Sequence, residues 1–140
     1  YSPTVTGASS SVNITENDSM VKLECQTNTI DHFVKEKNIT KLDFIKCDVE
    51  GAEFMVYKGG VETFAKHTPI IFTEMLRKWA AKFGYHPNDI IDFFKQFGYN
   101  CYTSHDGKLK AIDKVTEETI ETNFFFLHPT KHADKIKSLS

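Results

Sequence analysis

The chain lacks long hydrophobic runs, a marked excess of either charge, internal repeats and low-complexity segments. A membrane-spanning helix needs about 20 consecutive apolar residues, and no segment approaches that length. The formal net charge of −2 gives no indication of the basic surface that binds nucleic acid or an anionic membrane. We therefore expect a soluble protein that binds neither nucleic acid nor a membrane.

Cysteine is also scarce, and its spacing argues against two common uses. Cys25, Cys47 and Cys101 are odd in number and widely separated, unlike the cysteines of a disulfide framework or a zinc site. Cys47 and Cys101 lie in strand-like segments, so we expect buried, free thiols in a reducing compartment. No signal peptide is visible after Tyr1, and the sequence therefore favours a cytoplasmic location.

The segments that are present predict one α/β domain over residues 1–140. A chain of this length buries one core comfortably. We expect a loop over residues 1–28, rich in Ser and Thr, with a hairpin over residues 12–25. The core would span residues 29–128, and a lysine-rich tail over residues 129–140 would form a helix or coil.

Helices and strands alternate in the expected core, which indicates the second half of a doubly wound sheet with an antiparallel strand near one edge. The signals are apolar periodicity, caps, and turn residues. In chain order we expect a helix capped by Thr29, a buried strand 44–49, helices 52–58 and 61–66, a strand 70–74, a connecting loop 75–84, a helix from Pro87 that ends before Gly98, strands 100–103 and 109–112 joined at Asp106-Gly107, and a last strand 123–127.

The most informative stretch is LDFIKCDVEGAEFMVYKGG, residues 42–60. It reads as a strand that turns at Gly51 into a helix, and Asp48, Glu50 and Glu53 surround the turn. Sites in open α/β sheets form beyond the carboxyl ends of the strands, so these acids are placed for chemistry. Acids at a helix start are also common caps, and the residues alone leave both alternatives open.

Part of this stretch, IKCDVEGAEFMVYKGG, resembles the IKxDVEGxExxVLKG signature of the FkbM-family methyltransferases, which use S-adenosylmethionine. Mild departures fall at Cys47, Tyr57 and Gly60. The resemblance covers roughly residues 27–102, with looser agreement through NFFFLHP at residues 123–129. Its other matching segments are Thr29-Ile30-Asp31, TPIIFTE at residues 68–74, and GYN at residues 98–100.

The resemblance implies a Rossmann-like fold of the class I methyltransferase type, with a mostly parallel sheet. It also implies an O-methyltransferase that acts on a hydroxyl of a sugar, a glycolipid or a secondary metabolite. Such enzymes hold the cofactor with a glycine-rich turn, yet the seven glycines form no Gly-x-Gly turn. The resemblance therefore places the first strands before Tyr1 and makes this chain the substrate-side, C-terminal half. Alone, it is expected to bind S-adenosylmethionine poorly or not at all.

Three carboxylates are the candidate catalytic residues. Asp48 is the first choice as general base, or as a ligand of a divalent cation that acidifies a hydroxyl. Glu50 is the second choice, and Glu74, at the end of the adjacent strand, should reach the same crevice. Glu53 is better explained as an acid that accepts backbone hydrogen bonds, and Lys46 as the ion-pair partner of one of these acids.

Candidate acceptor-binding residues follow the second strand. Arg77 and Trp79 are the only Arg and the only Trp and should lie in a loop over the site, where a guanidinium grips an anion and an indole stacks on a sugar. His86 could accept a proton nearby, although a histidine at a helix entry is more often structural. His128 and His132 are four apart, but Pro129 argues against a helical metal pair.

Two other functions fit the same residues. One is a non-catalytic assembly or binding module that retains the fold, and the other is a carboxylate-based hydrolase, with or without magnesium. The expected partner is a small-molecule acceptor. Because the strand 44–49 would lack its neighbour, we also expect either the hairpin 12–25 to cover its edge or two copies to form a homodimer along it.

Overall fold

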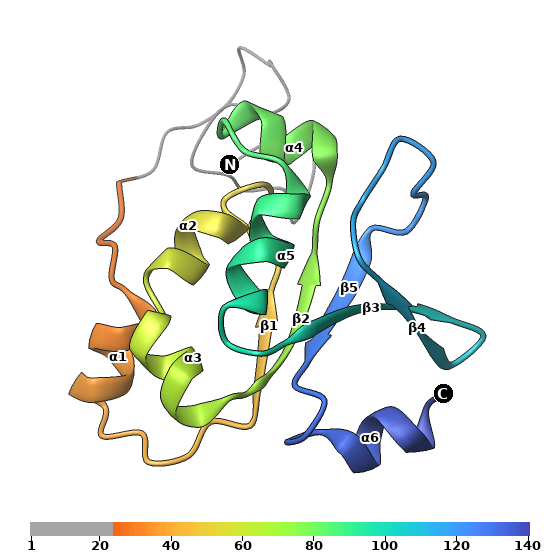
Figure 1. Ribbon diagram of the computed structural model, residues 1–140. Helices are drawn as coiled ribbons and strands as arrows, with labels where there is room; N and C mark the ends of the chain where they lie inside the picture. Colours follow the sequence, from red (N-terminus) through yellow and green to blue (C-terminus); the bar gives the residue numbers. More distant parts are fainter. Residues whose placement is uncertain (1–23) are drawn as a thin grey trace.

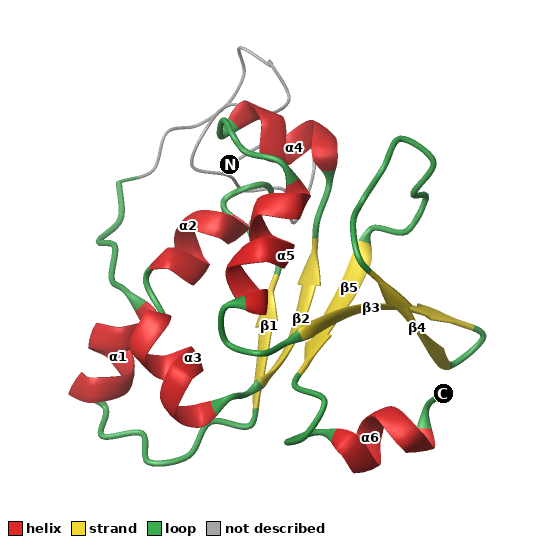
Figure 2. Cartoon of the chain, viewed as in Figure 1, coloured by secondary structure: helices red, strands yellow, loops and turns green. Residues whose placement is uncertain are grey.

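The computed structural model describes residues 24–140 (Figures 1 and 2). The hairpin expected over residues 12–25 lies almost wholly outside these residues. No helix of the described part is long and apolar enough to cross a membrane. In chain order the elements are α1 (Ile30–Glu36), β1 (Phe44–Cys47), α2 (Glu53–Lys58), α3 (Val61–His67), β2 (Ile70–Glu74), α4 (Arg77–Lys82), α5 (Pro87–Lys95), β3 (Asn100–His105), β4 (Lys108–Ile112), β5 (Asn123–Leu127) and α6 (Ala133–Ser138).

The strands form one five-stranded sheet in the order β1-β2-β5-β3-β4. Strands β1 and β2 are parallel, whereas β5 is antiparallel to both β2 and β3, and β3 and β4 form an antiparallel hairpin. The α/β class is confirmed, but the described strands form a mixed sheet and not a mostly parallel one. The reason is that β5 inserts between β2 and β3, which run in the same direction, and so separates them.

The core lies between one face of the sheet and helices α2, α3 and α5 (Figure 1). Its centre is the fully buried Phe94 of α5. The centroid of this ring lies 4.5 Å from that of Phe126 on β5, 4.8 Å from Tyr57 on α2 and 5.1 Å from Phe64 on α3. These tilted and edge-to-face aromatic contacts join three helices to the sheet, and each adds about 0.5–1.5 kcal/mol beyond area burial.

The described residues cover strand β1 on one face only, which corrects the expectation of a buried strand. Ile45 packs against the core and Cys47 is buried in it, whereas Phe44 on the opposite face is 50% exposed. Burial of the free thiols of Cys47 and Cys101 confirms their expected environment. Desolvation raises the pKa of each to about 12, so both thiols stay neutral and unreactive.

Strands β2 and β5 begin and end where expected. Strand β1 ends at Cys47 and not at residue 49, and β3 runs two residues further than expected, to His105. The hairpin turn has positive φ at both Asp106 and Gly107, the conformation that an Asp-Gly turn favours. One expectation is wrong: residues 77–82, expected to be loop, form α4. No local signal marks the start of this helix, because Leu76 at its N-cap makes no side-chain cap hydrogen bond.

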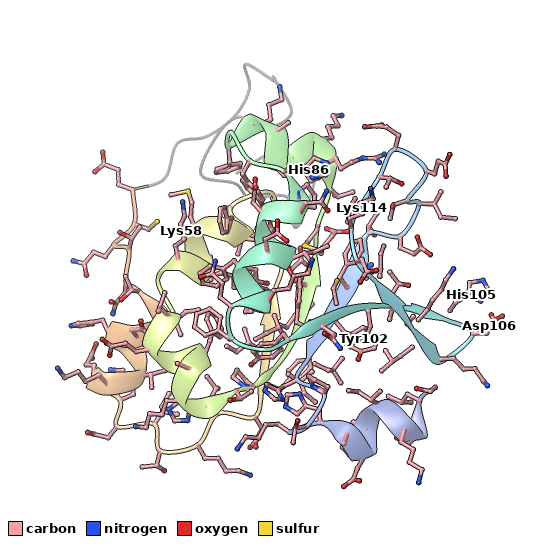
Figure 3. All side chains as sticks on the ribbon, viewed as in Figure 1. Lys58, His86, Tyr102, His105, Asp106 and Lys114 are labelled. Carbon is pink, nitrogen blue, oxygen red and sulfur yellow. The ribbon has the colours of Figure 1, made fainter. Side chains whose placement is uncertain are left out.

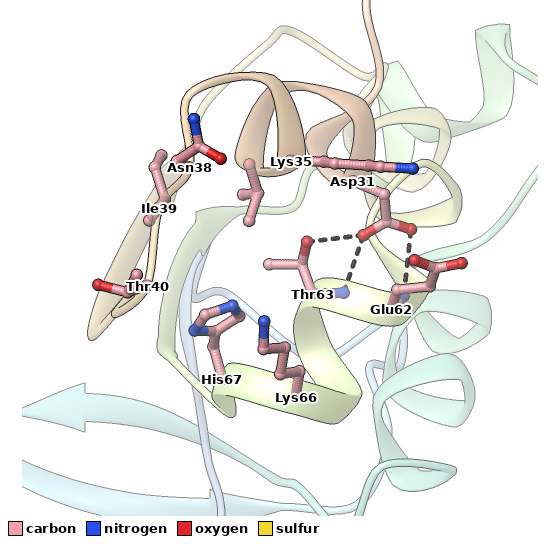
Figure 4. A pocket seen from close by; sticks show the side chains of 10 residues that line it. Asp31, Lys35, Asn38, Ile39, Thr40, Glu62, Thr63, Lys66 and His67 are labelled. Carbon is pink, nitrogen blue, oxygen red and sulfur yellow. Dashed lines mark hydrogen bonds between the residues drawn. The ribbon is translucent and has the colours of Figure 1, made fainter.

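Asp31 joins α1 to α3, as Figure 4 shows. Helix α3 follows Gly60, which has no side chain to cap it. Asp31 supplies the cap from another helix: its Oδ1 accepts the Thr63 N–H at 2.8 Å and the Thr63 hydroxyl at 2.6 Å, and its Oδ2 accepts the Glu62 N–H at 3.1 Å. The Thr-Ile-Asp segment is therefore a structural tie between two helices.

Replacing Asp31 with Ala should lower the free energy of unfolding by about 1–2 kcal/mol, because α3 loses its N-terminal acceptor. Urea denaturation measures this loss. The matched control is Asp92→Ala, which removes only an exposed Asp92–Lys95 pair and should cost less than about 1 kcal/mol. Equal losses for the two variants would show that the cap does not stabilise α3.

Candidate functional site

The turn after β1 is held in a conformation that few sequences allow. Glu50 and Gly51 both have positive φ, 53° and 99°, and glycine adopts such values without strain. A Cβ on Gly51 would lie 2.9 Å from both the Phe83 ring and the Trp79 carbonyl oxygen. Helix α4 therefore packs directly on this turn, and only glycine leaves room for it.

Glu53 fixes the same turn from within. It is only 3% exposed, and its Oε1 accepts the N–H groups of Val49, at 3.0 Å, and Gly51, at 3.1 Å. Its Oε2 accepts the Tyr85 hydroxyl at 3.1 Å. The expectation that Glu53 binds backbone is confirmed, whereas the contribution of Tyr85, 32 residues away in the chain, had no local sequence signal.

The variant Glu53→Ala should lose roughly 3 kcal/mol of stability, because two N–H groups and one hydroxyl lose their buried acceptor. Glu53→Gln is the matched variant: its amide oxygen can still accept from both N–H groups, and the loss should be closer to about 1 kcal/mol. Urea denaturation measures both values. Similar small losses for Ala and Gln would contradict the structural role of this carboxylate.

The three candidate catalytic carboxylates lie at the carboxyl end of strands β1 and β2. Cys47 and Thr73 are paired in the parallel β1–β2 ladder, so the residues that follow them, Asp48 and Glu74, lie at the same end of the sheet. Glu50 lies on the turn just beyond. Asn123, which pairs with Glu74 across the β2–β5 ladder, adds an amide at this edge that the sequence analysis did not identify.

The surroundings of these acids differ. Burial, followed by the charges of Asp48 and Glu50, raises the pKa of Glu74. Burial and the charges of Asp48 and Glu53 likewise raise the pKa of Glu50. Asp48 is instead more exposed and accepts a 2.7 Å hydrogen bond from the Lys46 ammonium, which confirms the expected ion pair and raises the pKa of Lys46.

The raised pKa of Glu74 predicts that Glu74→Gln stabilises the fold at neutral pH. In the unfolded chain this acid ionises near its ordinary value of 4.5, and in the folded chain it ionises at higher pH. The destabilisation that comes from ionising Glu74 in the folded chain is therefore absent at acid pH. It develops as the pH rises from the pKa of the unfolded chain through that of the folded chain. The melting temperature should exceed that of the parent protein at neutral pH and match it below the ordinary Glu pKa.

The control for this measurement is Glu118→Gln, a change at an exposed loop position that should leave the melting temperature unchanged at both pH values. A lower melting temperature for Glu74→Gln at neutral pH would mean that the ionised carboxylate stabilises the fold through a favourable contact.

The three expected acceptor-binding residues have defined structural positions. Arg77 starts α4, and its Nη2 lies 3.3 Å from the Glu117 carbonyl oxygen and 3.7 Å from the Glu117 carboxylate. Its Nη1 is buried with no hydrogen-bond partner among the described residues. Trp79 is partly buried on the same helix, with the Lys78 ammonium 4.9 Å from its ring centroid. Both residues are thus on a helix that packs on the turn, and not in a loop.

His86 lies at the end of the molecule where α4 is found, far from the β3–β4 turn that carries His105 and Asp106 (Figure 3). Its Nδ1 accepts the Asn88 N–H at 3.2 Å, and the Asp89 carboxylate accepts the His86 N–H at 2.8 Å. This capping box starts α5, which confirms the structural alternative for His86 and leaves only Nε2 for any other contact.

Metal ligation has little geometric support in the described part of the chain. Across residues 24–140, no group of three or more His, Cys, Asp or Glu side chains could hold a metal ion. His128 and His132 each use Nδ1 to accept backbone N–H groups of their own turn. A divalent cation at the carboxylates stays a prediction.

Comparison with known proteins gives one match. The family model of the methyltransferase FkbM domain matches residues 2–101, a range that contains β1, the turn, β2 and α5 and that begins earlier than the resemblance at residue 27 suggested. The match confirms the assignment made from the DVEG segment. No curated protein and no solved structure gives a significant match.

Proposed function

Because the chain belongs to the FkbM methyltransferase family, we propose that it is the acceptor side of an S-adenosylmethionine-dependent O-methyltransferase. The observation that supports this proposal is the position of three carboxylates: Asp48, Glu50 and Glu74 lie at the carboxyl end of the parallel strands β1 and β2. Two of these acids have raised pKa values. Such acids suit the removal of a proton from a hydroxyl.

S-adenosylmethionine, when bound, supplies a methyl group on a sulfonium, which is already strongly electrophilic. The described glycines do not fit a cradle for its nucleoside. A Cβ at Gly51, Gly59, Gly60 or Gly98 would meet protein atoms, and Gly84 and Gly107, although open, stand alone in turns. No residue of the described part is therefore assigned to the cofactor, whose use here rests on the family.

The role proposed for the carboxylates at the strand ends is to take up a proton from the acceptor. Glu74 is our first assignment as general base, since its carboxylate combines a raised pKa with a position at the strand end. The acceptor O–H bond breaks, the oxygen keeps the electron pair, and the proton moves to a Glu74 carboxylate oxygen. Glu50 is the alternative base, whereas Asp48 already holds the Lys46 ammonium and is better suited to tuning the local charge.

The acceptor is a hydroxyl-bearing small molecule: a sugar, a glycolipid or a secondary metabolite. Trp79 on α4 would pack against the acceptor. Arg77 on the same helix would bind an anionic group of the acceptor in place of the Glu117 carboxylate. Both roles are proposals that follow from the packing of α4 on the DVEG turn. A cytoplasmic location also stays a prediction, in keeping with the free thiols.

The test uses the complete product of the gene, methyl-tritiated S-adenosylmethionine, and a glycolipid extract or a panel of monosaccharides as acceptors. We expect transfer of the label to a hydroxyl, and a loss of kcat of at least about 100-fold in Glu74→Gln, the smallest effect expected for a general base. The KM for the acceptor should change little in this variant but rise in Trp79→Ala.

Asp92→Asn is the control and should leave both constants unchanged. Unaltered kcat in both Glu74→Gln and Glu50→Gln would remove these carboxylates from the chemical step. Failure to bind S-adenosylmethionine and to transfer label would instead favour the second candidate, a non-catalytic assembly or binding module. Hydrolysis without the cofactor would favour the carboxylate hydrolase.

A further inference from the structure

The turn after β5 is built on two histidine side chains. Nδ1 of His132 accepts the His128 N–H at 2.9 Å. Nδ1 of His128 accepts the N–H groups of Thr130, at 3.2 Å, and Lys131, at 3.3 Å. A ring nitrogen that accepts a hydrogen bond carries no proton, so both rings are neutral and hold their single proton on Nε2. The turn that leads into α6 therefore requires two unprotonated histidines.

The same two rings pack against the connection between α5 and β3. The His128 ring fills the space that Gly98 leaves open, because a Cβ on this glycine would lie 2.9 Å from the ring Nε2. The Tyr99 ring centroid lies 6.1 Å from that of His128 and 6.4 Å from that of His132. The two imidazoles therefore join the C-terminal segment, residues 128–140, to the rest of the fold.

Little buried surface holds this C-terminal segment in place. Helix α6 has no buried residue, and Figure 1 shows it at the end of the molecule opposite α4. Just after α6, the Leu139 carbonyl oxygen accepts the Leu109 N–H of β4, an outer strand of the sheet in the described part of the chain. A segment with few buried contacts opens at low cost in free energy, and the Leu109 amide reports whether the segment is docked.

Protonation works against the hydrogen bonds of both rings. A histidinium carries a proton on each nitrogen, so Nδ1 becomes a donor that faces backbone N–H donors. Burial and, after it, the charge of His128 lower the pKa of His132, whereas a hydrogen bond with the Thr68 backbone acts in the opposite direction. A histidine whose pKa is lowered in the docked state favours docking above its ordinary pKa. That contribution is lost as the pH falls from the ordinary pKa through the lowered one.

The charged groups around the pair do not favour its protonated form. Among the described residues, His32 and His105 have a carboxylate within ion-pair distance, but His128 and His132 do not. Asp134 is the one acid of the C-terminal segment, and it is exposed. The other titratable groups of the segment are lysines, and those next in sequence to its contacts at Thr68, Gly98 and Leu109 are His67, Tyr99, Lys108 and Lys110.

We propose that His128 and His132 form a pH-sensitive latch, and that protonation of both rings releases residues 128–140 from Tyr99 and from β4. Release uncovers the Leu109 N–H on the outer strand β4. The latch lies at the end of the molecule opposite α4 (Figure 1), away from the candidate carboxylates. It does not depend on the proposed methyltransferase activity.

Amide hydrogen exchange followed by NMR tests the latch on this chain, while the ring signals of the two histidines report their protonation. The pH is lowered from about 7.5 until both rings are protonated. We expect the protection factor of Leu109 to fall at least about fivefold, which corresponds to one net hydrogen bond of about 1 kcal/mol. The amide of Phe126, on the central strand β5, should keep its protection and show that the core remains folded.

The double variant His128→Asn/His132→Asn separates the hydrogen bonds from the titration. The Asn Oδ1 takes the place of Nδ1 and accepts the same N–H groups at every pH, and Asn is common in turns of this kind. Leu109 should therefore stay protected in the double variant at the pH that opens the parent protein. The matched control is His32→Asn, at an exposed position on α1, which should open as the parent protein does.

Three results would overturn the proposal. Protection of Leu109 that persists after both rings are protonated would show that their hydrogen bonds do not hold the segment. Equal loss of protection in the double variant would assign the effect to another group, such as His86, whose Nδ1 also accepts an N–H. Loss of protection at Phe126 before Leu109 or together with it would show that acid unfolds the whole domain.

Discussion

The turn after β1 depends on the buried carboxylate of Glu53. Its two oxygens accept the Val49 and Gly51 N–H groups and the Tyr85 hydroxyl, so one side chain joins the strand end, the start of α2 and the segment before α5. The positive φ of Glu50, 53°, is unfavourable for a residue with a Cβ and costs on the order of 1–3 kcal/mol. The contacts of Glu53 hold the backbone in that conformation, and the position of Glu50 follows from it.

Helix α4 and the carboxylates are placed by the same turn. Because the Phe83 ring and the Trp79 carbonyl oxygen fill the space beside Gly51, α4 lies close to the end of β1. Burial and, after it, the charges of neighbouring acids raise the pKa values of Glu50 and Glu74 at this end of the sheet. Such an arrangement is unfavourable for folding and favourable for accepting a proton, as is common at functional sites.

Local signals in the sequence predicted the elements that carry them, and long-range contacts account for what was missed. Gly51, Asp106-Gly107 and Pro87 mark turns or helix starts through their own backbone preferences, and the structure has them where expected. The insertion of β5 between β2 and β3 depends on pairing across the sheet, which periodicity does not encode. The Asp31 cap on α3 spans more than 30 residues, and α4 has no capping side chain at Leu76.

Of the candidate site, the grouping of the three carboxylates could be predicted from the sequence, because parallel strands have their carboxyl ends at the same end of a sheet. It could not rank the acids, since the ranking depends on burial and on which acid Lys46 reaches. Asp48, the first choice by position, holds that ammonium, whereas Glu74 and Glu50 have the raised pKa values. The positions of Arg77 and Trp79 on a helix could not be predicted, because the sequence carries no local signal for α4. The place of His86 at a helix entry could be predicted from Pro87, and the capping box of α5 agrees with it.

Lys46 moderates the repulsion among the carboxylates at the end of its own strand. Its ammonium donates a hydrogen bond to Asp48 at 2.7 Å and lowers the pKa of Glu74, against the larger effects of burial and of the neighbouring acids, which raise it. The raised pKa of Glu74 is therefore the outcome of opposing effects, of which Lys46 supplies the one that favours the ionised carboxylate. Removing the Lys46 charge should accordingly raise the pKa of Glu74 further.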